Sequence, residues 1–176
     1  MNKTLTAKLK KIKILVTDVD GVLTDSGAYY SDEGIELKKF SIRDGMGISL
    51  MQKAGYIVAI VTTEKTKIVE RRAERLKVTD IYQGVINKVA AVEELLKKYS
   101  LTWQELAYIG DDINDLPVLK KAGFAAAPSN ATKINKKIAD FVTQAEGGHG
   151  AVREVCDLLL DLKWKGESIA DLWLTK

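Results

Sequence analysis

Residues 18–24 have the sequence Asp-Val-Asp-Gly-Val-Leu-Thr and follow directly on the apolar run of residues 12–16. Such a run predicts a buried strand, so that Asp18 and Asp20 stand at its carboxyl end. Strand alternation points both side chains to one side, and Gly21 allows a sharp turn and a close approach to a ligand. Because two like charges so near each other are unfavourable alone, we expect a hard cation such as Mg²⁺, which takes oxygen ligands.

Beyond this loop, short apolar runs alternate with segments of helical period. We predict strands over residues 12–17, 56–62, 106–109 and 124–127, and helices near residues 45–54, 66–76, 87–99 and 115–122. The alternation predicts an α/β fold, a doubly wound, Rossmann-like parallel sheet with helices on both faces. Sheets of this kind bind ligands at the carboxyl ends of their strands, where Asp18, Thr62 and Asp111 fall.

Length and composition restrict the class of protein. The 176 residues fit one domain, residues 1–176, and the net charge of +3 is too small to favour a nucleic-acid partner. Cys156 is the only cysteine, which excludes an intrachain disulfide and favours a reducing cytoplasm. The first apolar run is too short for a signal peptide or a membrane span, so we expect no membrane partner.

An insertion at about residues 25–40 interrupts the alternation. It predicts a β-hairpin in which residues 27–30 and 35–38 flank a turn at residues 31–34. An isolated hairpin is only marginally stable. We therefore expect it either to pack on its own chain or to pair with another subunit.

Three further segments supply groups suited to phosphoryl transfer. Thr62 ends a strand, Lys88 begins a helix, and residues 110–115 (Gly-Asp-Asp-Ile-Asn-Asp) follow another strand. A carboxylate nucleophile can form an aspartyl phosphate, while a hydroxyl, an ammonium and a metal hold the phosphate oxygens. Each segment alone has a structural explanation: a helix cap, a solvated lysine or a strand residue. Their joint occurrence favours the phosphoryl-transfer site.

In this order the segments resemble the four motifs of the haloacid dehalogenase superfamily. The resemblance implies that Asp18 is the nucleophile and that Asp20 is the general acid and base. It implies that phosphate is bound by Thr62, Thr63 and Lys88.

The same resemblance implies a magnesium-dependent phosphoric monoester hydrolase. Its metal ligands would be Asp18, the backbone carbonyl of Asp20, and Asp111. Asp112 and Asp115 would support this metal shell directly or through water.

Over about residues 12–160 the resemblance narrows to small, capless sugar-acid phosphatases. Supporting stretches outside the core are the hairpin and residues 40–48, 82–88 and 147–155. The resemblance implies a homotetramer with active sites at subunit interfaces, closed by hairpins because there is no cap domain. The implied substrate is an acidic keto sugar phosphate of lipopolysaccharide biosynthesis, 3-deoxy-D-manno-octulosonate 8-phosphate first.

One departure leaves the substrate open. This chain has Thr63 and Glu64 where octulosonate phosphatases usually have glycine and arginine, and similar enzymes for 2-keto-3-deoxynononate 9-phosphate carry glutamate there. Glu64 would accept sugar hydroxyls or orient a basic partner. Arg72 and Arg75 would read a substrate carboxylate across an interface, or belong to an exposed charged helix face at residues 65–77.

Other residues carry two interpretations each. Arg43 contacts the substrate or belongs to the start of the following helix, and His149, the sole histidine, contacts the substrate or only shapes a surface loop. Cys156 lies in an apolar helical stripe, which favours core packing. The tail, about residues 163–176, reaches a neighbouring active site or simply docks as a terminus.

Two other classes share some of these features. A signalling receiver domain also uses an acidic pair, a phosphorylated aspartate, a threonine and a lysine, but the order of these residues along this chain argues against it. A noncatalytic assembly module is the third possibility, against which the intact Asp18, Asp20, Lys88 and Asp111 argue.

Overall fold

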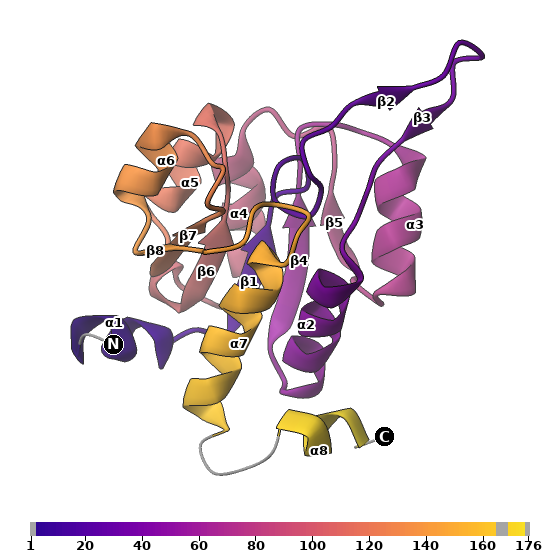
Figure 1. Cartoon of the computed structure of the whole chain (residues 1–176). Helices are drawn as coiled ribbons and strands as arrows, with labels where there is room; N and C mark the ends of the chain where they lie inside the picture. The colour runs from indigo at the N-terminus through magenta and orange to yellow at the C-terminus, as the bar shows by residue number, and fades with distance from the viewer. Residues whose placement is uncertain (1–2, 165–168, 175–176) are drawn as a thin grey trace.

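The computed structural model describes residues 3–164 and 169–174, and a six-stranded sheet forms its centre (Figure 1). The strand order is β5-β4-β1-β6-β7-β8, and every pairing in the sheet is parallel. The strands are β1 (Ile14–Thr17), β4 (Ile57–Val61), β5 (Asp80–Tyr82), β6 (Leu106–Ile109), β7 (Phe124–Ala127) and β8 (Phe141–Val142). The predicted doubly wound α/β sheet is confirmed.

The predicted strands agree best at the centre of the sheet. β6 and β7 have the predicted bounds. β1 and β4 are shorter than predicted, because some residues expected at their ends do not belong to the strands. The edge strands β5 and β8 were not predicted. Each is only two or three residues long and partly exposed, so neither leaves the continuous apolar run that marks a buried strand.

Helices cover both faces of the sheet, as predicted (Figure 1). Alternate strand residues divide the core, so that Leu15 and Ile60 pack with helices such as α2 and α7, whereas Ile14 and Tyr108 pack with α4 and α5. The helices are α1 (Lys3–Leu9), α2 (Ile42–Lys53), α3 (Lys67–Arg75), α4 (Lys88–Lys98), α5 (Leu116–Leu119), α6 (Lys133–Ile138), α7 (Ala151–Lys163) and α8 (Ile169–Leu174). Within the described ranges, none has the length and apolar character needed to cross a membrane.

Side-chain caps set where the helices near the carboxyl edge of the sheet begin. Ser41 accepts from the Asp44 N–H and begins α2, three residues before the predicted start, because its cap outweighs the helix-breaking tendency of the glycines that follow. Asn87 accepts from the Ala90 N–H at 3.2 Å and begins α4. This cap makes Lys88 the first residue of α4.

The insertion is a hairpin, as predicted, and it projects from the body of the protein (Figure 1). β2 (Tyr29–Tyr30) pairs antiparallel with β3 (Glu36–Leu37), with Tyr29 opposite Leu37. A bridge between Thr24 and Phe40 closes its base. The hairpin therefore begins where the loop that carries Asp18 and Asp20 ends.

The described part of the tail lies far from the hairpin. Helix α8 lies against α2 at the opposite end of the protein (Figure 1), and its Leu172 is buried. Residues 165–168 and 175–176, which belong to the predicted tail, lie outside the described residues. In this chain the described tail docks on its own body.

The packing of α4 gives a test of the fold. Leu95 is fully buried between α4 and the sheet, so Leu95→Ala should lower the free energy of unfolding by about 2–5 kcal/mol through a lost side chain and a cavity. Lys97→Ala, on the exposed side of the same helix, should change it by less than about 0.5 kcal/mol. Urea titration measures both values. Equal costs for the two variants would contradict the placement of α4.

Candidate active site

The central strands bring the candidate residues to one edge of the sheet. Asp18 directly follows β1, its N–H donating to the Ile109 carbonyl at 3.1 Å, and Thr62 directly follows β4. Asp111 follows β6, on the other side of β1 from β4. The chain runs outward from β1 to β4 and β5 before it crosses to β6, so β1 and β6 flank the point where the strand order reverses. In doubly wound sheets such a point forms the ligand crevice.

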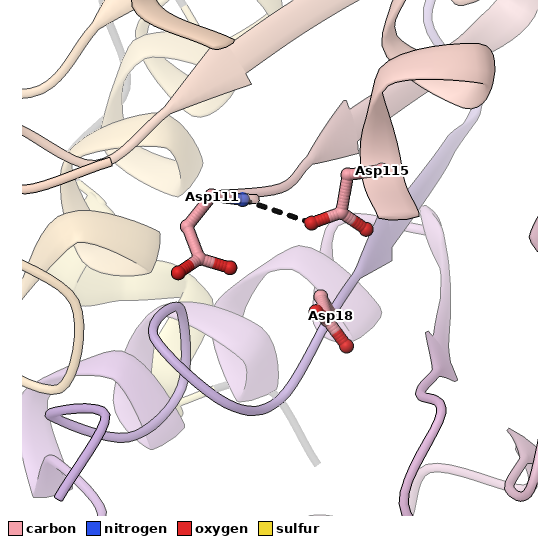
Figure 2. Close-up of side chains that lie close together, drawn as sticks. All are labelled: Asp18, Asp111 and Asp115. Carbon is pink, nitrogen blue, oxygen red and sulfur yellow. Dashed lines mark hydrogen bonds between the residues drawn. The ribbon is translucent and has the colours of Figure 1, made fainter. Parts of the chain in front are cut away.

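Three carboxylates meet there around one lysine. Asp18, Asp111 and Asp115 place carboxylate oxygens within 4.8 Å of one another (Figure 2). The Lys88 Nζ lies 2.8 Å from Asp18 Oδ2 and 2.7 Å from Asp115 Oδ1. Lys88 is only 2% exposed, so its interpretation as a solvated lysine is wrong. Its ammonium is held inside the acidic cluster.

Asp115 connects the other members of the cluster. Its Oδ1 accepts from the Tyr108 hydroxyl at 2.6 Å. Its Oδ2 accepts from the Asp111 N–H at 2.9 Å, the bond that Figure 2 shows as a dashed line. Burial, followed by the charge of Asp115, raises the pKa of Tyr108 well above its usual value, so this hydroxyl remains a donor. Sequence reasoning missed Tyr108, although strand alternation puts it on the side of β6 that faces α4, where Lys88 stands.

The acidic loop also contains a helix cap. Asp112 Oδ1 accepts from the Ile113 N–H at 2.7 Å at the start of a short 3₁₀ turn, Ile113–Asp115. The capping explanation therefore holds for Asp112, which is consistent with its exposed position. The Asp111 carboxylate faces the cluster with Asp18 instead (Figure 2).

The buried negative charge is not balanced by the described residues. Asp18 Oδ1 is buried and has no hydrogen-bond partner among them. Burial and then the charge of Asp115 raise the pKa of Asp18 to about 7, although Lys88 opposes this rise. Burial and the charges of Asp115 and Asp18 raise the pKa of Asp111 to about 7. A divalent cation would remove this cost, and an all-oxygen donor set suits Mg²⁺.

Glycines allow the loops of the site to pack closely. Gly21 has φ +80°, and a Cβ atom at this position would lie 2.0 Å from Asp111 Oδ2. A Cβ atom at Gly147 would lie 1.9 Å from the Gly21 carbonyl oxygen. The loop at Gly147 thus packs directly on the turn that joins Asp20 to the hairpin. A side chain at either glycine would separate these loops.

A pocket of about 690 Å³ opens above the cluster. Its floor includes Asp18 and Asp111, and its walls come from the hairpin, the segment after β4 and the acidic loop. The lining residues are Asp18, Asp20, Ser26, Gly27, Ala28, Tyr30, Glu36, Lys38, Thr62, Thr63, Glu64, Asp111, Asp112, Ile113 and Asn114. The hairpin therefore encloses the site of its own chain.

Lys38, which sequence reasoning did not single out, joins two of the predicted site residues. Its Nζ lies 2.5 Å from Asp20 Oδ1 and also forms an ion pair with Glu64 Oε2. Glu36 and Lys38 both line the pocket, as alternate residues of a predicted strand should when they face the same side. The signal was thus present in the hairpin, but the partners of Lys38 come from distant segments.

Three predicted substrate-binding residues lie outside this pocket. Arg72 donates from Nη2 to the Ser41 carbonyl at 2.8 Å, and its guanidinium lies 5.6 Å from the centre of the Phe40 ring. Arg43 and Arg75 are exposed and do not line the pocket. A role for these three arginines at the site of another subunit stays a prediction.

His149 and Cys156 lie in two further environments outside the pocket. His149 places Nε2 2.7 Å from the Lys39 Nζ and Nδ1 3.0 Å from the Gly147 carbonyl oxygen, linking the glycine-rich loop to the hairpin. Its role in substrate binding stays a prediction. Cys156 is fully buried on α7, and burial raises the pKa of its thiol, so the prediction of core packing is confirmed.

Together these features define a class of protein. A doubly wound sheet presents an acidic pair after β1, a threonine after β4, a buried lysine and a second acidic loop after β6. This set of functional groups is that of a hydrolase that transfers phosphoryl groups. Residues 57–155 match the haloacid dehalogenase-like hydrolase family, and the chain belongs to this family.

Comparison with individual proteins narrows the resemblance. The chain is 46% identical over 154 residues to the 3-deoxy-D-manno-octulosonate 8-phosphate phosphatase of Escherichia coli K12, an alignment that covers 88% of this chain and 82% of that one. It also resembles a structure of this phosphatase from Moraxella catarrhalis in complex with a magnesium ion, a phosphate ion and KDO, with a TM-score of 0.89, 38% identity, and coverage of 92% and 93%. The cobalt-bound phosphatase of Haemophilus influenzae gives a TM-score of 0.88 at 36% identity, with coverage of 96% and 99%.

The raised pKa values predict how pH and magnesium act together. Between the ordinary pKa of 3.8 and about 7, folded Asp18 and Asp111 hold protons that the unfolded chain has released. Their contribution to the stability of the metal-free protein is therefore full below about pH 4 and is lost as the pH rises through about 7. Since Mg²⁺ competes with these protons, its binding should be at least roughly tenfold tighter at about pH 8 than at about pH 5.5.

Thermal unfolding with and without Mg²⁺ at the two pH values measures this effect. Mg²⁺ should raise the melting temperature more at the higher pH, and Asp111→Asn should lose most of that response. An equal increase at both pH values would contradict the proton-linked cation site.

Proposed function

We propose that this chain is a magnesium-dependent phosphatase that removes the terminal phosphate of 3-deoxy-D-manno-octulosonate 8-phosphate in lipopolysaccharide biosynthesis. The observation that carries the proposal is the Asp18 carboxylate, which has one oxygen on Lys88 and one buried oxygen without a partner among the described residues, beneath an open pocket. The relatives named for this activity add independent support.

In the proposed mechanism the Asp18 carboxylate attacks phosphorus in line with the departing sugar oxygen. Asp20 donates its proton to that oxygen, and an aspartyl phosphate forms on Asp18. Asp20, now a carboxylate, accepts a proton from water, which attacks the phosphorus and releases inorganic phosphate. Asp18 is thereby restored, and Asp20 recovers in the second step the proton that it gave in the first.

Phosphate oxygens need positive charge and hydrogen bonds throughout this sequence. Lys88 lies beside Asp18 to provide charge, and Thr62 and Thr63 line or border the same pocket as hydroxyl donors. Asp18, Asp111 and the backbone carbonyl of Asp20 would hold Mg²⁺, which when bound neutralises charge on the phosphoryl oxygens. Asp115 keeps Lys88 and the acidic loop in place.

A nine-carbon substrate, 2-keto-3-deoxynononate 9-phosphate, is the second candidate. The observation in its favour is Glu64, which lines the pocket as a carboxylate at a position where the sequence resemblance expects arginine in octulosonate phosphatases. Its ion pair with Lys38 matches the interpretation that Glu64 orients a basic partner. We therefore assign the discrimination between the eight-carbon and nine-carbon substrates to Glu64 and the surfaces around it.

We also propose that the whole chain acts as one domain within a cytoplasmic homotetramer. Support comes from exposed apolar side chains on the hairpin, where Tyr30 is 70%, Ile35 56% and Leu37 62% exposed. Exposed apolar residues gathered on one element favour a protein contact. Such an interface would bring Arg43, Arg72, Arg75 or His149 of one subunit toward the pocket of another.

The two other classes fit the site less well. In the receiver interpretation the phosphoaspartate is a stable signal, whereas here Asp20 stands at the pocket beside the nucleophile to catalyse its hydrolysis. A noncatalytic module has no need for a lysine buried between two carboxylates, because taking these three charges out of water costs free energy. Phosphatase activity accounts for both features.

The decisive assay compares phosphate release from the octulosonate and nononate phosphates side by side, with Mg²⁺ and with EDTA. We expect Mg²⁺-dependent release with a higher kcat/KM for the eight-carbon substrate. Glu64→Arg should shift the ratio of the two kcat/KM values by about tenfold or more, because a hydrogen bond between a charged group and the sugar is worth about 1.5–3 kcal/mol.

Glu33→Arg provides the matched control. This substitution makes the same change of charge at an exposed hairpin position that does not line the pocket. It should leave the ratio unchanged. Tetramers that release no phosphate from either sugar would support the assembly module, and a stable phosphoprotein without turnover would support the receiver interpretation.

A further inference from the structure

The charges that line the pocket are strongly unequal. Among the described residues the lining contains six carboxylates and one basic side chain, Lys38. The Lys38 side chain is 8% exposed, so its stem is buried while its ammonium sits between Asp20 and Glu64. An ordered lysine in such a position is held by both acids, because a flexible four-carbon side chain otherwise remains solvated and mobile.

The contact with Asp20 falls on one particular oxygen. Lys38 Nζ lies 2.5 Å from Asp20 Oδ1, and the Thr24 hydroxyl makes a longer contact of 3.5 Å to the same atom. No other side-chain hydrogen bond to this carboxylate occurs in the part of the chain that the structure describes. Oδ1 is thus the anchored oxygen, and Oδ2 is the one left available for proton transfer.

We propose that Lys38 is a positioning residue for the reaction: it fixes the Asp20 carboxylate by Oδ1, is itself fixed by Glu64, and so presents Asp20 Oδ2 to the sugar oxygen and then to water. This inference rests on the proposed function, which gives Asp20 its acid–base role. In both steps Lys38 keeps its own proton, and the proton moves only between Asp20 and the reacting oxygen.

The need for an anchor follows from the surroundings of Asp20. Its side chain is 38% exposed, in contrast to the buried Asp18, so packing alone does not fix its orientation. Proton transfer requires hydrogen-bond distance to the reacting oxygen, and small errors in orientation are costly. A charge-assisted hydrogen bond from Lys38 supplies the constraint that packing does not.

The origin of Lys38 gives the hairpin a second purpose. Lys38 follows β3, whereas Asp20 lies in the loop after β1 and Glu64 in the segment after β4. One ammonium therefore joins three segments that line the pocket. The hairpin walls the pocket and also orients the acid–base group.

Steady-state kinetics of Lys38→Met with Mg²⁺ and octulosonate 8-phosphate test the role of Lys38. Because general acid–base catalysis contributes about 10²–10⁴-fold, misplacing Asp20 should lower kcat by about 10- to 100-fold. KM should change by less than about threefold, since the lost interaction acts in the transition state. Lys38→Arg should recover at least part of kcat. Lys65→Met, which removes the same charge next to Glu64 but outside the pocket lining, should keep the wild-type kcat.

A crystal structure of Lys38→Met examines the positioning without relying on turnover. We expect the Asp20 carboxylate to leave its single orientation while the sheet and Lys88 stay in place. The proposal is overturned if Asp20 keeps its orientation, if kcat is unchanged, or if the loss lies in KM alone. Wild-type protein that releases no phosphate would refute the proposed function instead, and the orientation of Asp20 would then decide the positioning claim by itself.

Discussion

The ion pair between Lys88 and Asp18, completed by Asp115, is the interaction on which the site depends. Carboxylates and an ammonium are taken out of water at the ends of β1 and β6, where their desolvation must be offset by close contacts. Lys88 balances only part of the charge, because Asp18 and Asp111 both retain a raised pKa of about 7. The remaining negative charge suits the site to a metal ion, which would in turn attract the oxygens of a phosphoryl group.

The fold places these charges by ordinary means. Parallel pairing aligns the carboxyl ends of β1, β4 and β6, the Asn87 cap begins α4 at Lys88, and Gly21 lets the first loop approach Asp111. The hairpin then closes one side of the pocket and delivers Lys38 to Asp20. In the proposed mechanism the buried cluster supplies the charge for phosphoryl transfer, and the partly exposed Asp20, held by Lys38, serves proton transfer.

The sequence predicted the functional groups that directly follow the strands. Central strands such as β6 could be predicted because they are continuous apolar runs, and Asp18 and Asp111 follow directly from them. The short edge strand β5 left no such signal. Tyr108 and Lys38 were missed because their importance lies in partners that only the tertiary structure brings close. The interpretation of Lys88 as a solvated residue was wrong because its burial also depends on the tertiary structure. Arg75 is exposed and lies outside the pocket of its own chain, so its predicted contact with the substrate would need a neighbouring subunit.

The central claim is that Asp18 carries the phosphoryl group during turnover. Rapid acid quenching of the protein mixed with Mg²⁺ and radiolabelled sugar phosphate, followed by peptide mass spectrometry, measures this directly. The account predicts an acyl phosphate on Asp18 that forms and decays fast enough to account for phosphate release, and none on Asp18→Asn, which keeps its fold and loses turnover. Label on another residue, or undiminished turnover by Asp18→Asn, would contradict it.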